Sequence, residues 1–235
     1  MKSTSRLAIC IGLALVAGCA KTTVNNRQVY EGPKLARPSR IVVYDFAATA
    51  SDIPAWAAGA TAYAGYEAPQ SAEQLAAGRK LGDQVAKELV NEIHSMGLPA
   101  EQGVRTTPLN VGDIAIVGYF ESVDEGSAVE RVALGFGAGS ASMKTRVEGY
   151  QMTATGPRRL GGGDLDSGTG KGPGLIVPIA VTIATANPIG LIVGGAVKVG
   201  TEASGYSTIE GVSRRTAKEI GEQLEVAFQR QGWIE

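Results

Sequence analysis

Residues 113–123 read D-I-A-I-V-G-Y-F-E-S-V, and this stretch decides the fold more than any other part of the chain. Aliphatic β-branched and aromatic side chains dominate it, which is typical of a strand buried in a sheet. Residues 40–47, R-I-V-V-Y-D-F-A, share this composition and predict a second buried strand, at which the folded domain is expected to begin. Two such strands indicate that a sheet forms the centre of the domain.

Two long amphipathic helices are predicted around the internal strand. The first begins after Ser71, which stands three residues before Gln74, as in a capping box. The second begins near Ser207, which has Glu210 at the same spacing. Each segment has apolar residues every three to four positions and ends at a glycine, so each helix has one face for packing on the sheet.

The region between the helices adds further strands. Residues 142–154 alternate between the two faces of a strand, with charges on one face, which predicts a half-exposed strand. Residues 129–136 are expected to pair with the internal strand across a turn at residues 125–126. This order of elements predicts an α+β fold in which two long helices pack on one antiparallel sheet, as a single domain over residues 40–235.

Residues 52–69 form an insertion rich in alanine, glycine and tyrosine, and they include Trp56, Tyr63 and Tyr66. A loop this long and this apolar is uncommon in a compact domain unless its side chains contact something. Two interpretations stay open. The insertion is either a contact surface for a partner subunit or a membrane, or a flap over the domain's own core.

The first twenty residues have the layout of a signal peptide. Lys2 and Arg6 supply positive charge, a short apolar run follows, and small residues up to Gly18 precede Cys19. The run is too short to cross a bilayer as a helix, which needs about 20 residues. Residues 15–20, L-V-A-G-C-A, resemble the lipobox of bacterial lipoproteins, and an ordinary signal peptide with an incidental cysteine is the alternative.

The lipobox resemblance implies cleavage after Gly18 and attachment of palmitate and other acyl groups at Cys19. Residues 1–18 are then a lipoprotein signal peptide, and residues 19–39, which are polar and contain two prolines, are expected to form a flexible tether. Several acyl chains hold a protein stably on a bilayer, whereas one chain does so only marginally. Ala20, rather than an aspartate, follows the cysteine and resembles the signal for sorting to the outer membrane. We therefore expect a protein anchored in the outer membrane, with its domain facing the periplasm.

Residues 173–199 form an apolar insertion rich in glycine and alanine. The Asn-Pro pair at residues 187–188 interrupts it, because proline disfavours helix at the residue before it and starts a new helix itself. The segment therefore predicts a helical hairpin of two half-length helices rather than one membrane span. Small residues at four-residue spacing give it a stripe along which two helices pack closely. The stripe consists of Thr182, Ala186, Gly190 and Gly194.

Three interpretations of residues 173–199 stay open. The hairpin is buried in the domain or forms a subunit interface, it dips into the membrane, or the segment is disordered. In an exposed position it would present a large apolar patch, so we expect something to cover it.

Composition argues against several classes of function. The chain has 22 basic and 23 acidic residues, and removal of Lys2 and Arg6 with the signal peptide leaves 20 against 23, a net charge of −3. This balance gives no indication of nucleic acid as a partner. Cys10 lies in the removed part and Cys19 is consumed by lipid, so no thiol remains for a metal site or a nucleophile.

Two glycine-rich motifs fall short of binding sites. Residues 135–139, G-F-G-A-G, are followed by a predicted strand instead of the helix that a nucleotide-binding loop needs. Residues 164–168, D-L-D-S-G, begin like a calcium loop, but Leu175 stands where the bidentate glutamate is required, so a glycine-rich turn is expected. We expect no cofactor, no metal, no nucleotide and no catalytic residues, and hence a protein that is not an enzyme.

Residues 126–139 read G-S-A-V-E-R-V-A-L-G-F-G-A-G and carry a family resemblance. Together with the lipobox, the V-Y-D-F strand and the apolar segment before the last helix, they resemble the bacterial envelope lipoproteins grouped as domain of unknown function 4410. More distantly, the chain is similar to the curli secretion pore subunit and to the activator lipoproteins of penicillin-binding proteins. The family brings no catalytic residues to this sequence.

The resemblance and the composition together favour a non-catalytic interaction or assembly factor in the cell envelope. Its expected partners are the lipid bilayer, through the acyl anchor, and either envelope proteins or further copies of itself. The alternative is an oligomeric secretion or pore component that uses residues 173–199.

Overall fold

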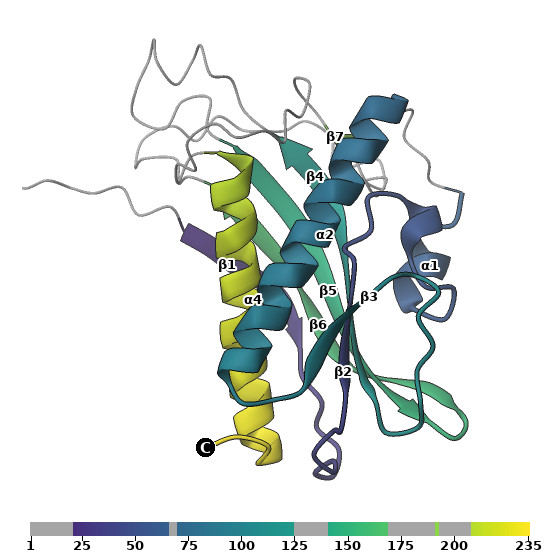
Figure 1. Ribbon diagram of the computed structural model, residues 1–235, viewed down its shortest axis with the longest axis vertical. Coiled ribbons are helices and arrows are strands. Elements are labelled where there is room, and N and C mark those ends of the chain that lie inside the picture. The colour runs from purple at the N-terminus through teal and green to yellow at the C-terminus, as the bar shows by residue number, and fades with distance from the viewer. Residues whose placement is uncertain (1–20, 66–69, 125–140, 169–190, 193–207) are drawn as a thin grey trace, which may run out of the picture.

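The computed structural model describes residues 21–65, 70–124, 141–168, 191–192 and 208–235 (Figure 1). Helices and strands are both present, which confirms the α+β class. In chain order the elements are β1 (Lys21–Gln28), β2 (Ile41–Tyr44), η1 (Ala50–Asp52), α1 (Ala58–Ala62), α2 (Ala72–Ser95), β3 (Ala100–Gly103), β4 (Ile114–Asp124), β5 (Ser142–Thr153), β6 (Gly156–Gly168), β7 (Leu191–Ile192) and α4 (Ile209–Gln231). Within these ranges, no helix has the length and apolar character needed to cross a membrane.

The sheet is mixed, so the predicted antiparallel sheet is wrong. In the described ranges, the strands follow the order β1-β6-β5-β4-β2-β3, and β7 pairs with β4 outside this path. Pairing is antiparallel from β1 to β4, whereas β2 is parallel to both β3 and β4. The chain passes from β2 through α2 to β3, and a helical crossover brings the next strand back in the same direction. The sequence did not indicate β3, because A-E-Q-G is a short, polar strand at the sheet edge.

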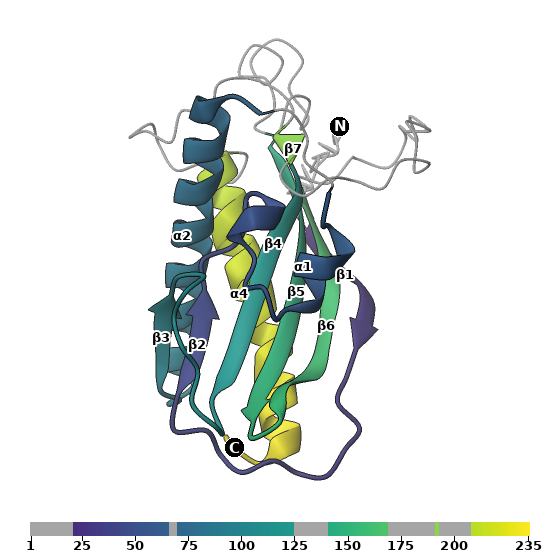
Figure 2. The same ribbon diagram turned by 90° about the vertical axis from the view of Figure 1, so that its right-hand side faces the viewer.

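Both faces of the central strands are covered. α2 and α4 pack side by side on one face, and the segment with η1 and α1 lies over the other (Figure 2). In β2, Ile41 and Val43 belong to the core under the two helices, while Val42 and Tyr44 belong to the core on the α1 side. Burial on both faces explains why the central strands read as continuous apolar runs.

The insertion at residues 52–69 is a flap over the domain's own core, as far as Gly65, where the described stretch ends. Ile53 and Tyr63 are buried in the core on the α1 side. Trp56 packs edge-on against Tyr44 and Tyr150, with ring centroids 5.7 and 5.2 Å apart. Of the two interpretations left open, the described residues support the flap.

Helix α2 begins with the capping box expected at Ser71 and Gln74, in which each side chain bonds the other residue's backbone amide (3.1 and 2.8 Å). It then lies very close to the sheet. A Cβ atom on Gly82 would stand 2.0 Å from the carbonyl oxygen of Phe46, and one on Gly118 would stand 2.2 Å from the Phe46 ring. Two glycines therefore make room for the backbone and the ring of Phe46.

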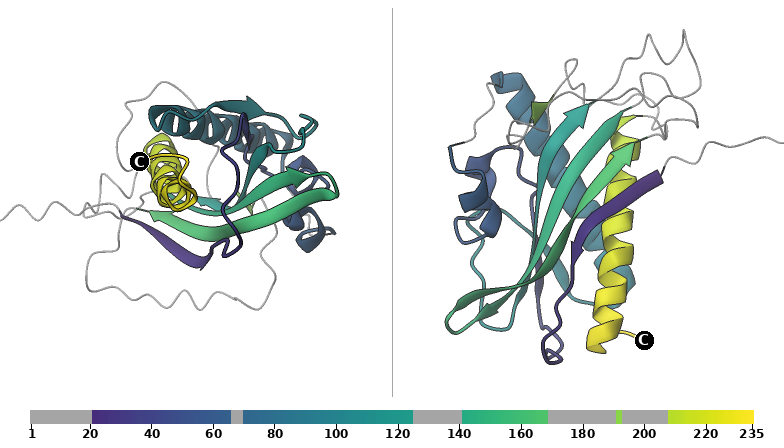
Figure 3. Two further views of the ribbon diagram at one scale, coloured as in Figure 1. Left: turned by 90° about the horizontal axis from the view of Figure 1, so that it is seen from below. Right: turned by 180° about the vertical axis from the view of Figure 1, so that it is seen from behind.

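Residues 21–28, which belong to the predicted tether of residues 19–39, form strand β1. This strand pairs antiparallel with β6 at the edge of the sheet, next to α4 (Figure 3). Its sequence K-T-T-V-N-N-R-Q gave no strand signal, because an edge strand with one partly buried apolar residue, Val24, needs no apolar alternation. The folded part of the chain is thus larger than the predicted domain of residues 40–235.

Most of the predicted hairpin in residues 173–199 lies outside the described residues, as does the predicted strand at residues 129–136. Inside the hairpin, Leu191–Ile192 form the two-residue strand β7, paired with β4, so the helix predicted at these two positions is wrong. Pairing with an open stretch of the β4 edge outweighs local helix propensity here. The last helix takes Thr208 as its N-cap, accepting from the Gly211 amide (3.3 Å), one residue after the predicted cap.

Candidate functional site

The residues predicted to carry function lie outside the described part of the chain. This holds for the lipidation site, the cleavage site and the stripe of small residues. These residues, which stay predictions, are Cys19, Gly18, Thr182, Ala186, Gly190 and Gly194.

One row across the sheet stands next to the predicted anchor. Lys21 is paired with Gly168, Gly168 with Ser142, and Ser142 with Asp124, so these four residues form a single line, which we call the end row. Two extended residues span at most about 7 Å, and only this length of chain separates Cys19 from Lys21. The chain leaves the described part directly after Asp124 and Gly168. The end row therefore marks the end of the strands that lies two residues from Cys19 along the chain. Residues 125–140 and 169–190 follow directly after two of its members.

A polar cleft of about 590 Å³ opens between α1 and the outer face of β5 and β6. Arg146 stands at its centre, in ion pairs with Asp164 (2.5 Å) and Glu121 (3.1 Å). The hydroxyl of Tyr63 donates to Glu121 (2.8 Å) and accepts from Arg146 (3.2 Å). Charges from three strands are thus joined to a tyrosine of the covering flap.

Glu148 is the centre of a second network in the same cleft, and its side chain is only 3% exposed. Its carboxylate accepts from the Tyr150 hydroxyl (2.8 Å) and from the Gly59 amide (3.3 Å), and it pairs with Arg159 (3.4 Å). The Tyr150 hydroxyl in turn accepts from the amide of Ala58 (2.8 Å). The first two backbone amides of α1 are therefore satisfied by β5 side chains, which fixes the start of α1 on the sheet.

Burial and hydrogen bonding shift the pKa values of Tyr63, Tyr150, Asp164 and Arg146. Burial is the main cause that raises the pKa of Tyr63, and burial raises the pKa of Tyr150 to about 12, so both hydroxyls stay protonated. Burial alone would raise the pKa of Asp164, but hydrogen bonds from Arg146 and Asn26 outweigh it and place that pKa below its ordinary value. The hydrogen bond to Asp164 also raises the pKa of Arg146.

The cleft fits a structural role better than proton transfer. Each of its carboxylates bonds an arginine and a hydroxyl or amide donor, so the groups hold one another in place. Asp45 and Asp52 lie outside the cleft, where Asp45 bonds Gln102 (2.6 Å) and Asp52 bonds Arg79 (2.9 Å). The described residues contain no group of three or more His, Cys, Asp or Glu side chains arranged for a metal ion.

Sequence reasoning missed this network because its members come from distant segments. The alternation of residues 142–154 indicated a solvated charged face, whereas the flap buries Glu148 there. The glycine-rich turn predicted at residues 164–168 is wrong, because these residues form the end of β6, between β5 and β1. Three consecutive glycines in β6 hid the strand, since glycine has low strand propensity and a neighbouring strand on each side outweighs it.

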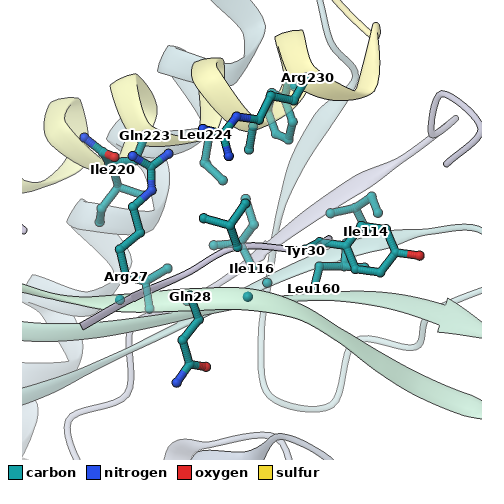
Figure 4. A pocket seen from close by; sticks show the side chains of 18 of the residues that line it. Arg27, Gln28, Tyr30, Ile114, Ile116, Leu160, Ile220, Gln223, Leu224 and Arg230 are labelled. Atoms are coloured by element: carbon teal, nitrogen blue, oxygen red, sulfur yellow. The ribbon is translucent and has the colours of Figure 1, made fainter. Parts of the chain in front are cut away.

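A second cavity, of about 170 Å³, lies on the opposite face of the sheet, between α4 and strands β1, β5 and β6. In Figure 4, Ile220 and Leu224 of α4 stand opposite Ile116 and Leu160 of the sheet. The cavity extends to Phe228 and Trp233 at the C-terminal end of α4. Its lining is therefore apolar, in contrast to the cleft below α1.

The comparisons with known proteins place the chain in a family and add no assigned activity. Two solved structures are similar, both from Paraburkholderia phytofirmans: a single-residue variant of the PelC dodecamer and the PelC dodecamer itself. Both are 14% identical to this chain, and both matches cover 65% of it. The match covers 85% of the variant's chain with a TM-score of 0.37, and 86% of the other chain with a TM-score of 0.36. No curated protein matches the sequence. The family described as domain of unknown function (DUF4410) matches residues 41–186, which is more than half of the chain. This chain belongs to the DUF4410 family.

Proposed function

We propose that this protein is a lipoprotein of the bacterial envelope, held by acyl groups on Cys19 at the periplasmic face of the outer membrane. Its α+β domain acts there as a non-catalytic interaction or assembly factor. The observation that carries the proposal is the end row, in which Lys21 is paired into the sheet only two residues after Cys19.

This short connection would set the orientation of the domain. A long flexible tether lets a domain turn freely, whereas β1 is hydrogen-bonded to β6 from its first residue. An acyl group at Cys19 therefore turns the end row toward the bilayer. The opposite end of the sheet, with the turn between β5 and β6 and the C-terminus of α4, then points into the periplasm.

The end row also supports contact with a membrane or with envelope proteins. Residues 173–199, the long apolar stretch of the sequence, belong to the segment that leaves the sheet after Gly168. Residues 126–139, which carry the family resemblance, belong to the segment that leaves after Asp124. Both segments thus start at the end of the sheet that is two residues from the predicted anchor, where a bilayer or an envelope protein is available to cover apolar side chains.

Metabolic labelling and site-directed cross-linking test the proposal. Labelling with palmitate should mark the protein and should not mark the Cys19→Ala variant. In the lipidated protein, Cys19 is acylated and Cys10 is removed, so an introduced cysteine is the single free thiol. A thiol cross-linker at Ser142→Cys, in the end row, should capture a defined envelope protein or a second copy in intact cells.

The matched control places the same probe at Thr155→Cys, in the exposed turn between β5 and β6 at the opposite end of the sheet. It should capture far less of the same product. Equal capture from both positions, or a protein that carries no palmitate, would contradict the proposal. The alternative of a secretion or pore component predicts conductance by the purified oligomer in planar bilayers, and silence from a verified oligomer would remove it.

A further inference from the structure

The apolar cavity under α4 leaves part of the hydrophobic core incompletely packed. Leu224 of α4, Leu160 of β6, Val24 of β1 and the nearby Leu35 all line it, and each remains only partly buried. Protein interiors are normally packed as densely as organic crystals, so apolar side chains around a void lose contacts that they could make. A cavity of similar size, about 150 Å³, is known to bind benzene, so this space is large enough for part of an apolar ligand.

Gly149 is one of the residues that line this space. In the sheet it is paired with Ile116 on one side and with Gly161 on the other, below α4. A Cβ atom at Gly149 would meet nothing within 4 Å, whereas one at Gly161 would stand 2.4 Å from the Gln28 carbonyl oxygen. Close packing thus requires glycine at position 161 and does not require it at position 149. The absent side chain at position 149 leaves the cavity open.

Two arginines reach the cavity, Arg27 from β1 and Arg230 from α4 (Figure 4). Among the described residues, neither guanidinium group forms a hydrogen bond or an ion pair, and no aspartate or glutamate lines the cavity. The apolar space therefore has a positively charged rim without internal counter-charge. This complementarity selects a ligand that has an apolar part and a negative charge.

The backbone of β1 is shaped to present one of these arginines. The pairing with β6 shifts between Asn25 and Gln28, and Asn26 has a φ of 49°, the single positive value at a non-glycine residue in the described ranges. The Asn26 amide donates to Asp164 on the outer face (2.7 Å), and Arg27 then points toward α4 (Figure 4). Bulges of this kind commonly re-aim a side chain next to a binding site.

We propose that this cavity binds the alkyl chain of an anionic amphiphile, such as a fatty acid, whose head group lies between Arg27 and Arg230. The chain fills the space beside Gly149 and completes the burial of Leu160 and Leu224. The inference goes beyond the proposed function and does not depend on acylation of Cys19, because the cavity lies along β1, β5 and β6 under α4 and contains no part of the end row.

Quenching of tryptophan fluorescence by bromodecanoate tests this directly. Trp233 lines the cavity, and Trp56→Phe leaves it as the single tryptophan of the chain. With the full chain in nanodiscs of zwitterionic phospholipid, bromodecanoate should quench Trp233 with a saturable dependence on concentration. Gly149→Leu fills the cavity and should weaken the affinity at least about tenfold, because a leucine side chain takes the place of the alkyl chain.

The double variant Arg27→Gln/Arg230→Gln tests the head group without disturbing the core, since both side chains are exposed. It should weaken binding of bromodecanoate about tenfold. Raised salt should weaken binding to the protein that keeps both arginines, and should leave binding to the double variant unchanged. The neutral analogue bromodecanol should bind both proteins equally.

Three results would overturn the proposal. The first is the absence of saturable quenching, which is expected if a segment of this chain or a second copy fills the cavity. The second is unchanged affinity in Gly149→Leu with an intact unfolding transition. If that variant does not fold, unchanged affinity of the arginine double variant decides against the proposal in the same way.

Discussion

Replacement of Glu148 by alanine should destabilise the domain more than removal of any exposed carboxylate. The Glu148 side chain is 3% exposed, and it holds Tyr150, the Gly59 amide and Arg159 together below α1. The substitution leaves the Tyr150 hydroxyl without its acceptor in a buried place and frees the first turn of α1. We therefore expect a weaker attachment of the flap as well as a lower free energy of unfolding.

The magnitude follows from the three contacts. The 2.8 Å hydrogen bond from Tyr150 to a charged carboxylate contributes about 1.5–3 kcal/mol. The contacts to the Gly59 amide and to Arg159 are longer, at 3.3 and 3.4 Å, and the Arg159 side chain is 39% exposed, so solvent screens it and together they add about 1 kcal/mol or less. The expected loss for Glu148→Ala is about 2–4 kcal/mol, which lowers Tm by about 5–15 °C in a domain of this size.

Urea unfolding, followed by circular dichroism and by tryptophan fluorescence, measures this loss. Glu148→Gln keeps an acceptor for Tyr150 and should cost about 1 kcal/mol. Glu101→Ala is the matched control, because Glu101 forms a 3.0 Å ion pair with Arg40 while 51% exposed, and it should cost less than about 1 kcal/mol. Equal effects of Glu148→Ala and Glu101→Ala would refute the view that the buried network fixes α1.

Three further results are expected. Gly118→Ala should cost about 1–3 kcal/mol, because its Cβ would meet the Phe46 ring at 2.2 Å, and a double-mutant cycle with Phe46→Leu should recover most of this cost. Burial raises the pKa of Tyr44 and Tyr150 from 10.0 to about 12, so their contribution to stability is complete below pH 10 and is lost as pH rises toward 12. Tyrosinate absorbance should therefore appear together with unfolding. Ionisation of both tyrosines near pH 10 in the folded protein would count against their burial. Cys19→Ala should move the protein from the membrane fraction to the soluble fraction in cell fractionation, and continued sedimentation with membranes would point to another means of attachment.

The sequence predicted those elements whose signals are local. β2 and β4 are buried on both faces, so their own residues show apolar runs without help from the rest of the chain. The start of α2 was equally readable, because the Ser71 and Gln74 capping box needs only residues within one turn. The direction of the strands was not readable in this way, since β2 and β3 are brought together by the path of α2.

The candidate sites depend on contacts that no local pattern records. Glu148 is charged in a strand that alternates as if one face were solvated, and its burial results from a flap about ninety residues earlier in the chain. Arg27 reaches the apolar cavity because of a bulge in a polar edge strand, and Gly149 matters because the space above it is empty. Tertiary arrangement, rather than composition, gives each of these residues its role.

Strand β1 links the predicted anchor site to the cavity under α4. Its first residue is paired two positions after Cys19, and six residues later the same strand presents Arg27 to the cavity under α4. An edge strand is held by hydrogen bonds on one side only, and within the described part of the chain β1 pairs with β6 alone. An alkyl chain in the cavity adds apolar contacts between α4 and the β1–β6 pair. A ligand there would therefore stabilise the pairing of β1 with β6, and β1 is the strand that follows the predicted acyl anchor. Amide hydrogen exchange in β1 should therefore slow when bromodecanoate is bound, and exchange in β2, which has strands on both sides, should stay unchanged.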